Sequence, residues 1–253
     1  MTRRATLATL LLALGLAAGC GGTLQEQQRG NADYEAGKAA FDRSDWYDAI
    51  NDLKAYVEQF PGTEKTDDAL YYLGRSYFGQ KDYALASSQF DRLIRDFPQS
   101  PYQAPALYYL ARCDDLDSRQ ALLDQTETRR ALDRYKQFLD VYPNDEHAAE
   151  AHDRVRELRD RLAEKRYRNG RLYVKLHQPR AAKIYLQGVL TEYPESKWAG
   201  DAALLLADVL LKEGKKDEAI AALKKIPDDV ASADVKRRAE ERLRSLTGPG
   251  EPR

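Results

Sequence analysis

The sequence predicts an all-α solenoid, a stack of helical hairpins, and three observations carry this prediction. In the segment 69–98, Leu70, Leu73 and Tyr77 recur at the spacing that places them on one helix face. Framework residues return 37 positions later in four pairs: Pro61 and Pro98, Gly37 and Gly74, Ala49 and Ala86, and Trp46 and Tyr83. No segment shows the sustained two-residue alternation that is typical of strands.

The segment 69–98 also shows what one hairpin contains. Gln80–Asp82 is predicted to form the turn, and Ala86, Phe90 and Leu93 mark the buried face of a second helix. Pro98 ends that helix, because proline lacks the backbone N–H and clashes with the preceding turn. A hairpin of this kind resembles the tetratricopeptide repeat (TPR), a helix-turn-helix unit of about 34 residues.

We predict five such repeats followed by a C-terminal capping helix, since a terminal repeat needs a polar outer face. Repeat three carries eight extra residues within 114–130, and one long helix from Asp145 to about Lys175 leads into repeat four. The predicted divisions are a cleaved signal peptide (1–19), a lipidated flexible tether (20–30), an N-terminal half with repeats one to three (31–144), a C-terminal half with repeats four and five and the cap (145–247), and a disordered tail (248–253).

The first 20 residues have the composition of a bacterial lipoprotein signal. Arg3 and Arg4 precede an apolar core that is shorter than the roughly 20 residues of a membrane span. The segment ends Leu-Ala-Ala-Gly-Cys at Cys20, which resembles a lipobox, so we expect Cys20 to carry the lipid. The alternative is an ordinary signal peptide with an incidental cysteine. Gly21, in place of the aspartate that retains many lipoproteins at the inner membrane, favours the outer membrane.

Composition and motifs argue against catalysis, cofactors and nucleic acid. The formal net charge is −1, without the basic excess that nucleic-acid binding needs. The sequence contains no phosphate-binding loop, nucleophile elbow or zinc motif, so we predict no enzyme activity and no metal. Asp114, Asp115 and Asp117 lack the glycine and glutamate of a calcium loop and are predicted to form a solvated acidic loop. Cys113, just past an apolar helix face, is predicted to be packed.

One set of residues exceeds what the repeat framework requires. A tyrosine recurs at intervals of 37 in the first helices, each followed four residues later by a cation and, in two repeats, seven residues later by phenylalanine. The predicted peptide-binding groove consists of Tyr34, Lys38, Phe41, Tyr71, Arg75, Phe78, Tyr108 and Arg112. Aromatic rings supply contact area and a guanidinium can hold a carboxylate, so this line suits a peptide with aromatic side chains and a free C-terminus. Alternatively, the tyrosines pack neighbouring repeats and the cations only solubilise.

A lipobox, five TPR-like repeats, an insertion in the third and a long helix entering the fourth together resemble the BamD (ComL/YfiO-like) family. The most specific segment is 162–196, which contains Tyr167, Gly170 and Tyr173 and ends in Tyr-Pro-Glu-Ser. The sequence departs from the family pattern in two places. One is the turn at 176–179, and the other is Tyr185, which stands where the family has an arginine.

The resemblance implies a lipid-anchored, periplasm-facing protein of the outer membrane of a Gram-negative-type bacterium, within the β-barrel assembly machinery (BAM complex). It implies that the N-terminal half receives C-terminal segments of unfolded outer-membrane proteins. It also implies that the C-terminal half docks on the periplasmic (POTRA) domains of BamA, with Tyr173, Arg180 and Tyr185 as candidate contacts, beside other BAM lipoproteins. The alternative is a periplasmic TPR scaffold lipoprotein for cell-envelope or peptidoglycan machinery.

Overall fold

A computed structural model describes residues 24–118, 125–226 and 231–248, and these ranges contain eleven α-helices and no strand. The chain forms two compact units, Met1–Tyr102 and Gln103–Arg253. The predicted boundary between the two halves, after residue 144, is therefore at the wrong position. The physical reason is that α6 of repeat three packs onto the long helix that follows it, so the third repeat belongs with the fourth and fifth.

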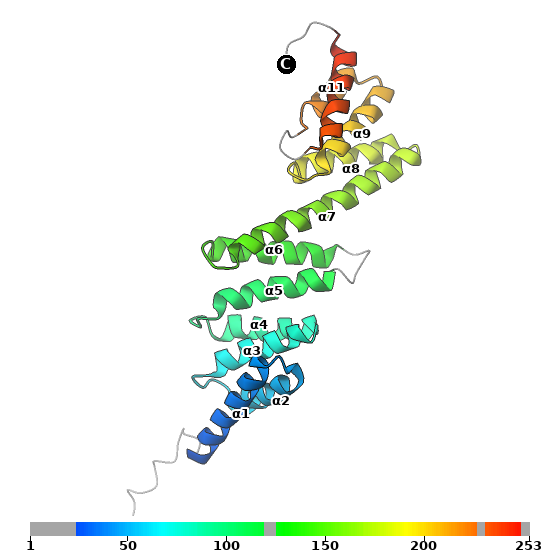
Figure 1. Cartoon of the computed structure of the whole chain (residues 1–253). Coiled ribbons are helices and arrows are strands. Elements are labelled where there is room, and N and C mark those ends of the chain that lie inside the picture. The colour runs from blue at the N-terminus through cyan, green and yellow to red at the C-terminus, as the bar shows by residue number, and fades with distance from the viewer. Residues whose placement is uncertain (1–23, 119–124, 227–230, 249–253) are drawn as a thin grey trace, which may run out of the picture. The chain divides into compact units, whose positions relative to one another are not determined.

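The first unit consists of two helical hairpins (Figure 1). Helix α1 (Leu24–Asp42) pairs with α2 (Trp46–Gln59), and α3 (Thr66–Gly79) pairs with α4 (Tyr83–Asp96), while α2 also packs on α3. The buried side chains come from the apolar stripes that the sequence shows, among them Leu53, Leu70, Leu73, Phe90 and Leu93. Helices α2 and α3 therefore each bury one face against their hairpin partner and another against each other, as in a TPR solenoid.

Helix α1 begins at Leu24, inside the segment that was predicted to be a flexible tether. The tether prediction is thus wrong for residues 24–30. Gly30 is buried, and a Cβ atom there would lie 2.8 Å from the Phe60 ring. The glycine that looked like a linker residue is a close-packing position, where the absence of a side chain lets α1 approach the end of α2.

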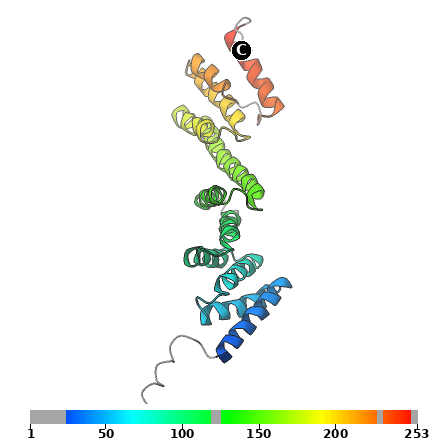
Figure 2. The same ribbon diagram turned by 90° about the vertical axis from the view of Figure 1, so that its left-hand side faces the viewer.

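The second unit contains the remaining helices (Figures 1 and 2). Their bounds are α5 (Gln103–Ser118), α6 (Thr126–Val141), α7 (Ala148–Lys175), α8 (Pro179–Glu192), α9 (Ala199–Lys212), α10 (Lys216–Leu223) and α11 (Ala233–Thr247). Helix α7 has 28 residues and packs on both α6 and α8, which confirms the long helix that the sequence predicts. Helix α11 contacts α9 and α10 and buries Val235 and Ala239, as a cap should.

Aromatic-proline pairs end the second helix of the first four hairpins, whereas α10 of the fifth ends at Lys224. Phe60, Phe97, Tyr142 and Tyr193 are the C-caps of α2, α4, α6 and α8, and each backbone N–H donates to the carbonyl four residues earlier at 2.8–3.0 Å. Their ψ angles of 50–65° leave the helical region. The following proline causes this, because its ring excludes the α conformation of the preceding residue.

The acidic segment of repeat three is not a solvated loop. Asp114 and Asp115 lie in α5 and are only 3% and 2% exposed. Arg130 and Arg134 of α6 lie 2.9 and 3.2 Å from the Asp114 carboxylate, and Arg161 of α7 lies 3.5 Å from that of Asp115. The prediction was wrong because the arginines that pair with these buried carboxylates lie 16–46 residues further along the sequence.

The hairpin turns share a left-handed residue. Ser44, Lys81, His177 and Gly214 occupy the same turn position and have φ angles of 59°, 67°, 55° and 76°. Among these four described turns only that of the fifth repeat has glycine there, although a side chain makes this conformation unfavourable by about 1 kcal/mol.

Replacing His177 by glycine is therefore expected to raise the free energy of unfolding of the second unit by about 0.5–1 kcal/mol. Urea denaturation followed by Trp198 fluorescence measures the change. The matched variant is Gly214→Ala, which places a Cβ at the same turn position and should lower stability. A His177→Gly variant with unchanged or reduced stability would contradict the expectation.

Candidate functional site

The three tyrosines of the predicted groove are buried. Tyr34, Tyr71 and Tyr108 are 6%, 8% and 1% exposed. Tyr71 contacts the ring of Phe90, and Tyr108 contacts those of Tyr135 and Phe138. This corrects the expectation that their rings face a ligand, because a side chain that closes the contact between helices has no surface left for a peptide.

A residue at the start of the next hairpin covers each of these rings. Lys65 Nζ lies 4.5 Å from the centroid of Tyr34, while the Tyr102 and His147 rings lie 4.6 and 4.3 Å from those of Tyr71 and Tyr108. In the fourth repeat Trp198 stacks on Tyr167 at 5.3 Å.

These pairs have a regular sequence separation. The covering residue follows its tyrosine by 31 positions, or by 39 in the third repeat with its eight extra residues. Tyr167 and Arg171 also extend the tyrosine-cation pattern to a fourth repeat. The spacing of 31 is the signal that could have assigned the tyrosines to packing between repeats.

The tyrosine hydroxyls also have partners. Tyr34 donates to Asp68 Oδ2 at 2.9 Å, Arg75 Nη1 donates to the Tyr71 oxygen at 2.7 Å, and Arg112 Nη1 donates to the Tyr108 oxygen at 3.3 Å. Burial, assisted by the neighbouring carboxylates, raises the pKa of Tyr34 and of Tyr108. The Tyr108 hydroxyl in turn lowers the pKa of the Glu150 carboxyl by hydrogen bonding, and Arg112 lowers it further. Tyr108 and Arg112 of α5 therefore link that helix to Glu150 of α7 within the second unit.

The cations Lys38 and Arg75 of the first unit are only partly buried and contact further aromatic rings, although Arg75 also keeps its hydrogen bond to Tyr71. Lys38 Nζ lies 4.6 Å from the centroid of Tyr72, and the Arg75 guanidinium lies 5.8 Å from that of Phe41. The Phe41 and Tyr72 rings are 4.9 Å apart, and Tyr102 lies 6.1 Å from Tyr72. We call these five partly buried residues the first-unit aromatic surface.

The first-unit aromatic surface retains two cations and one phenylalanine of the predicted groove. It replaces the buried tyrosines by Tyr72 and Tyr102, which the sequence interpretation missed. The other phenylalanine of the predicted groove, Phe78, is partly buried and packs edge-on against Tyr83 of its own hairpin. Lys38 is already paired with Asp42 at 2.5 Å, so a bound carboxylate would compete with that side chain. Peptide binding by these residues stays a prediction.

The candidate docking residues lie at the turn end of the fourth hairpin. Tyr173 of α7 and Tyr185 of α8 stack with ring centroids 5.3 Å apart and an interplanar angle of 14°, and Arg180 is exposed. Large apolar side chains are exposed on the same hairpin, at Leu172 of α7, Leu176 of the turn and Ile184 of α8. The structure thus brings Tyr173 and Tyr185 together, on a hairpin whose surface is partly apolar.

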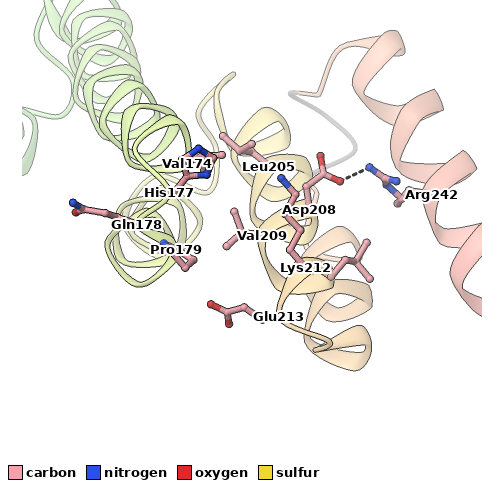
Figure 3. Close-up of a pocket in the computed structure, with 11 residues that line it drawn as sticks. Val174, His177, Gln178, Pro179, Leu205, Asp208, Val209, Lys212, Glu213 and Arg242 are labelled. Atoms are coloured by element: carbon pink, nitrogen blue, oxygen red, sulfur yellow. Dashed lines mark hydrogen bonds and ion pairs between the residues drawn. The ribbon is translucent and has the colours of Figure 1, made fainter.

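A cavity of about 630 Å³ lies in the second unit between the α7–α8 turn, α9 and α11 (Figure 3). Val174 and Leu205 point toward it, and an ion pair between Asp208 of α9 and Arg242 of α11 forms one wall. No sequence pattern indicated this cavity, because residues from three separate segments line it.

Other predicted features are simpler to place. Cys113 is buried, as predicted, whereas the lipidation residue Cys20 lies outside the described residues. Across 24–118, 125–226 and 231–248, no three His, Cys, Asp or Glu side chains lie close enough to hold a metal ion. In the same ranges no helix has both the length and the apolar character needed to cross a bilayer.

The chain resembles several solved TPR structures, although at low identity. A TPR protein from Bacteroides fragilis is 15% identical, with 86% of this chain and 91% of that chain covered and a TM-score of 0.48. A thermophilic TPR protein of Thermus thermophilus is 19% identical, with 85% and 98% covered and a TM-score of 0.41. The TPR2AB domain of yeast Sti1, in a pHSP90 complex, is 13% identical, with 87% and 83% covered and a TM-score of 0.45.

The family comparison is more specific than the structural one. No curated protein matches the chain. The sequence profile of the YfiO family, described as an outer membrane lipoprotein, matches residues 26–225, which include all but the ends of the described repeats. With this match and its TPR solenoid, the chain belongs to the YfiO family of outer membrane lipoproteins.

Proposed function

We propose that this chain is a non-enzymatic lipoprotein of the β-barrel assembly machinery, anchored through lipid on Cys20 and facing the periplasm. In this role it scaffolds the POTRA domains of BamA and receives C-terminal segments of unfolded outer-membrane proteins. The observation that carries the proposal is the family match over residues 26–225. A TPR solenoid supports it physically, since stacked hairpins offer extended surfaces for other polypeptides.

The first-unit aromatic surface is the proposed client site. Phe41, Tyr72 and Tyr102 offer aromatic contact area, and Lys38 and Arg75 offer positive charge within 6 Å of the Phe41 or Tyr72 ring. A peptide ending in phenylalanine with a free carboxylate presents the complementary groups, an aromatic side chain next to a negative charge.

The scaffold role is tested by affinity purification from detergent-solubilised outer membranes, with the lipidated protein as bait. We expect a β-barrel protein with repeated periplasmic domains to co-purify. The matched bait is Cys20→Ala, which lacks the lipid and should lose the outer-membrane location. Recovery of peptidoglycan-associated proteins instead of a β-barrel subunit would favour the alternative envelope scaffold.

Reversing the charge of Arg75 tests the client site separately. Arg75→Glu is expected to weaken binding of a peptide ending in Phe by about tenfold or more, because a charge-assisted hydrogen bond worth roughly 1.5–3 kcal/mol is replaced by repulsion. Fluorescence anisotropy measures the affinity, and circular dichroism checks that helical content is unchanged.

Two controls make this result interpretable. Arg95→Glu, on the exposed side of α4, introduces the same charge change away from the surface and should leave the affinity unaltered. Amidation of the peptide C-terminus should mimic the loss seen with Arg75→Glu. An identical titration curve for Arg75→Glu and the unmodified chain would remove the client site while leaving the scaffold role standing.

A further inference from the structure

The cavity of the second unit occupies the inner repeat positions that carry aromatic and cationic residues in the first unit. Aligning Gly74 with Gly170 and Ala207 shifts the numbering by 96 and 133 residues. Val174 then matches Phe78, Leu205 matches Tyr72, and Asp208 matches Arg75. The repeat geometry is therefore kept, while the chemistry changes from aromatic and cationic to aliphatic and acidic.

The floor of this cavity is aliphatic. Val174 of α7, Pro179 of α8, and Leu205 and Val209 of α9 line it (Figure 3), together with Leu211 of α9. A volume of about 630 Å³ lies within the range of cavities that bind ligands. A floor of this kind favours branched aliphatic side chains, which bury their surface there with a gain of about 0.8 kcal/mol per CH₂ group.

The charged groups around the floor are mostly neutralised by one another. Arg242 pairs with Asp208, while Lys183 and Lys215 pair with Glu213. Lys212 also lines the cavity, and its side chain forms no ion pair with any residue in the described part of the chain. The uncompensated charge at the rim is therefore positive.

We propose that this cavity binds a short segment of a partner polypeptide whose aliphatic side chains fill the floor and whose glutamate or aspartate carboxylate pairs with Lys212. Charge complementarity selects this occupant, since the aliphatic floor excludes a purely ionic ligand and Lys212 disfavours a basic segment. The site differs from the stacked Tyr173 and Tyr185 and from the first-unit aromatic surface. It does not depend on client binding.

Titration of the full mature chain with blocked pentapeptides, followed by amide chemical shifts, tests the proposal. The probes are acetyl-Ala-Leu-Glu-Leu-Ala-amide and its forms with Gln or Lys in place of Glu. We expect shift changes at Val174, Leu205 and Lys212, with the Glu peptide binding about threefold more tightly than the Gln peptide, as for a partly exposed ion pair. The Lys peptide should bind most weakly.

Two variants test the contribution of the Lys212 charge and that of the aliphatic floor separately. Lys212→Glu should reverse the order of the Glu and Lys peptides, whereas Lys224→Glu, exposed and outside the cavity, should not. Leu205→Gln should weaken all three peptides while preserving their order. Equal affinities for the three peptides, or shifts confined to other residues, would overturn the proposal. So would concentration-dependent shifts at these residues without peptide, because a second copy would then occupy the cavity. Because the experiment contains only the purified chain and short peptides, its result does not depend on whether the chain binds BamA.

Discussion

Replacing Tyr108 by alanine is expected to lower the free energy of unfolding of the second unit by about 3–5 kcal/mol, the range for removing a buried aromatic side chain. Tyr108 is the most buried of the three repeated tyrosines, and its ring contacts Tyr135, Phe138 and His147. The substitution removes all three contacts and leaves a cavity between α5, α6 and α7.

The measurement uses the two tryptophans of the chain. In a Trp46→Phe background, Trp198 alone reports unfolding of the second unit in urea. Val141→Ala is the matched control, since that side chain is exposed on α6 of the same unit and its truncation should cost less than about 0.5 kcal/mol. Tyr108→Phe keeps the ring and should retain most of the stability. If Tyr108→Ala unfolded at the same urea concentration as the unmodified chain, the assignment of the tyrosines to packing would be wrong.

The second large effect is expected from Asp114→Asn, which should destabilise the same unit by about 3 kcal/mol. This nearly isosteric change removes the negative charge that Arg130 and Arg134 share, and breaking a buried pair from one side leaves uncompensated charge. The same Trp198 signal in urea measures it.

Asp117→Asn is the matched control for this effect. Asp117 lies three residues further along the same helix but is exposed, so neutralising it should change stability by less than about 0.5 kcal/mol. If both substitutions changed the free energy of unfolding by the same small amount, Arg130 and Arg134 would not depend on the Asp114 charge. The assignment of Asp114 to a buried ionic cluster would then be wrong.

The candidate site was only partly readable from the sequence. The interval of 37 revealed the tyrosines and cations and placed them correctly on the first helices. It could not tell that Tyr71 faces the hairpin interior while its neighbour Tyr72 reaches the surface, because both lie on one helix only 100° apart. That distinction depends on Tyr102, which directly precedes α5 in the sequence, stacks on the Tyr71 ring and meets the Tyr72 ring only edge-on.

The sequence by itself determined the local architecture of this protein: the hairpins, the aromatic-proline helix ends, the long helix α7 and the cap. These features follow from helical periodicity and from the backbone limits of proline, which act over a few residues. Tertiary structure decided which polar and aromatic residues are available to partners. Asp114 became buried, Gly30 became a packing position and Lys212 came to line a cavity, because burial depends on residues that are distant in sequence and meet only when the hairpins stack.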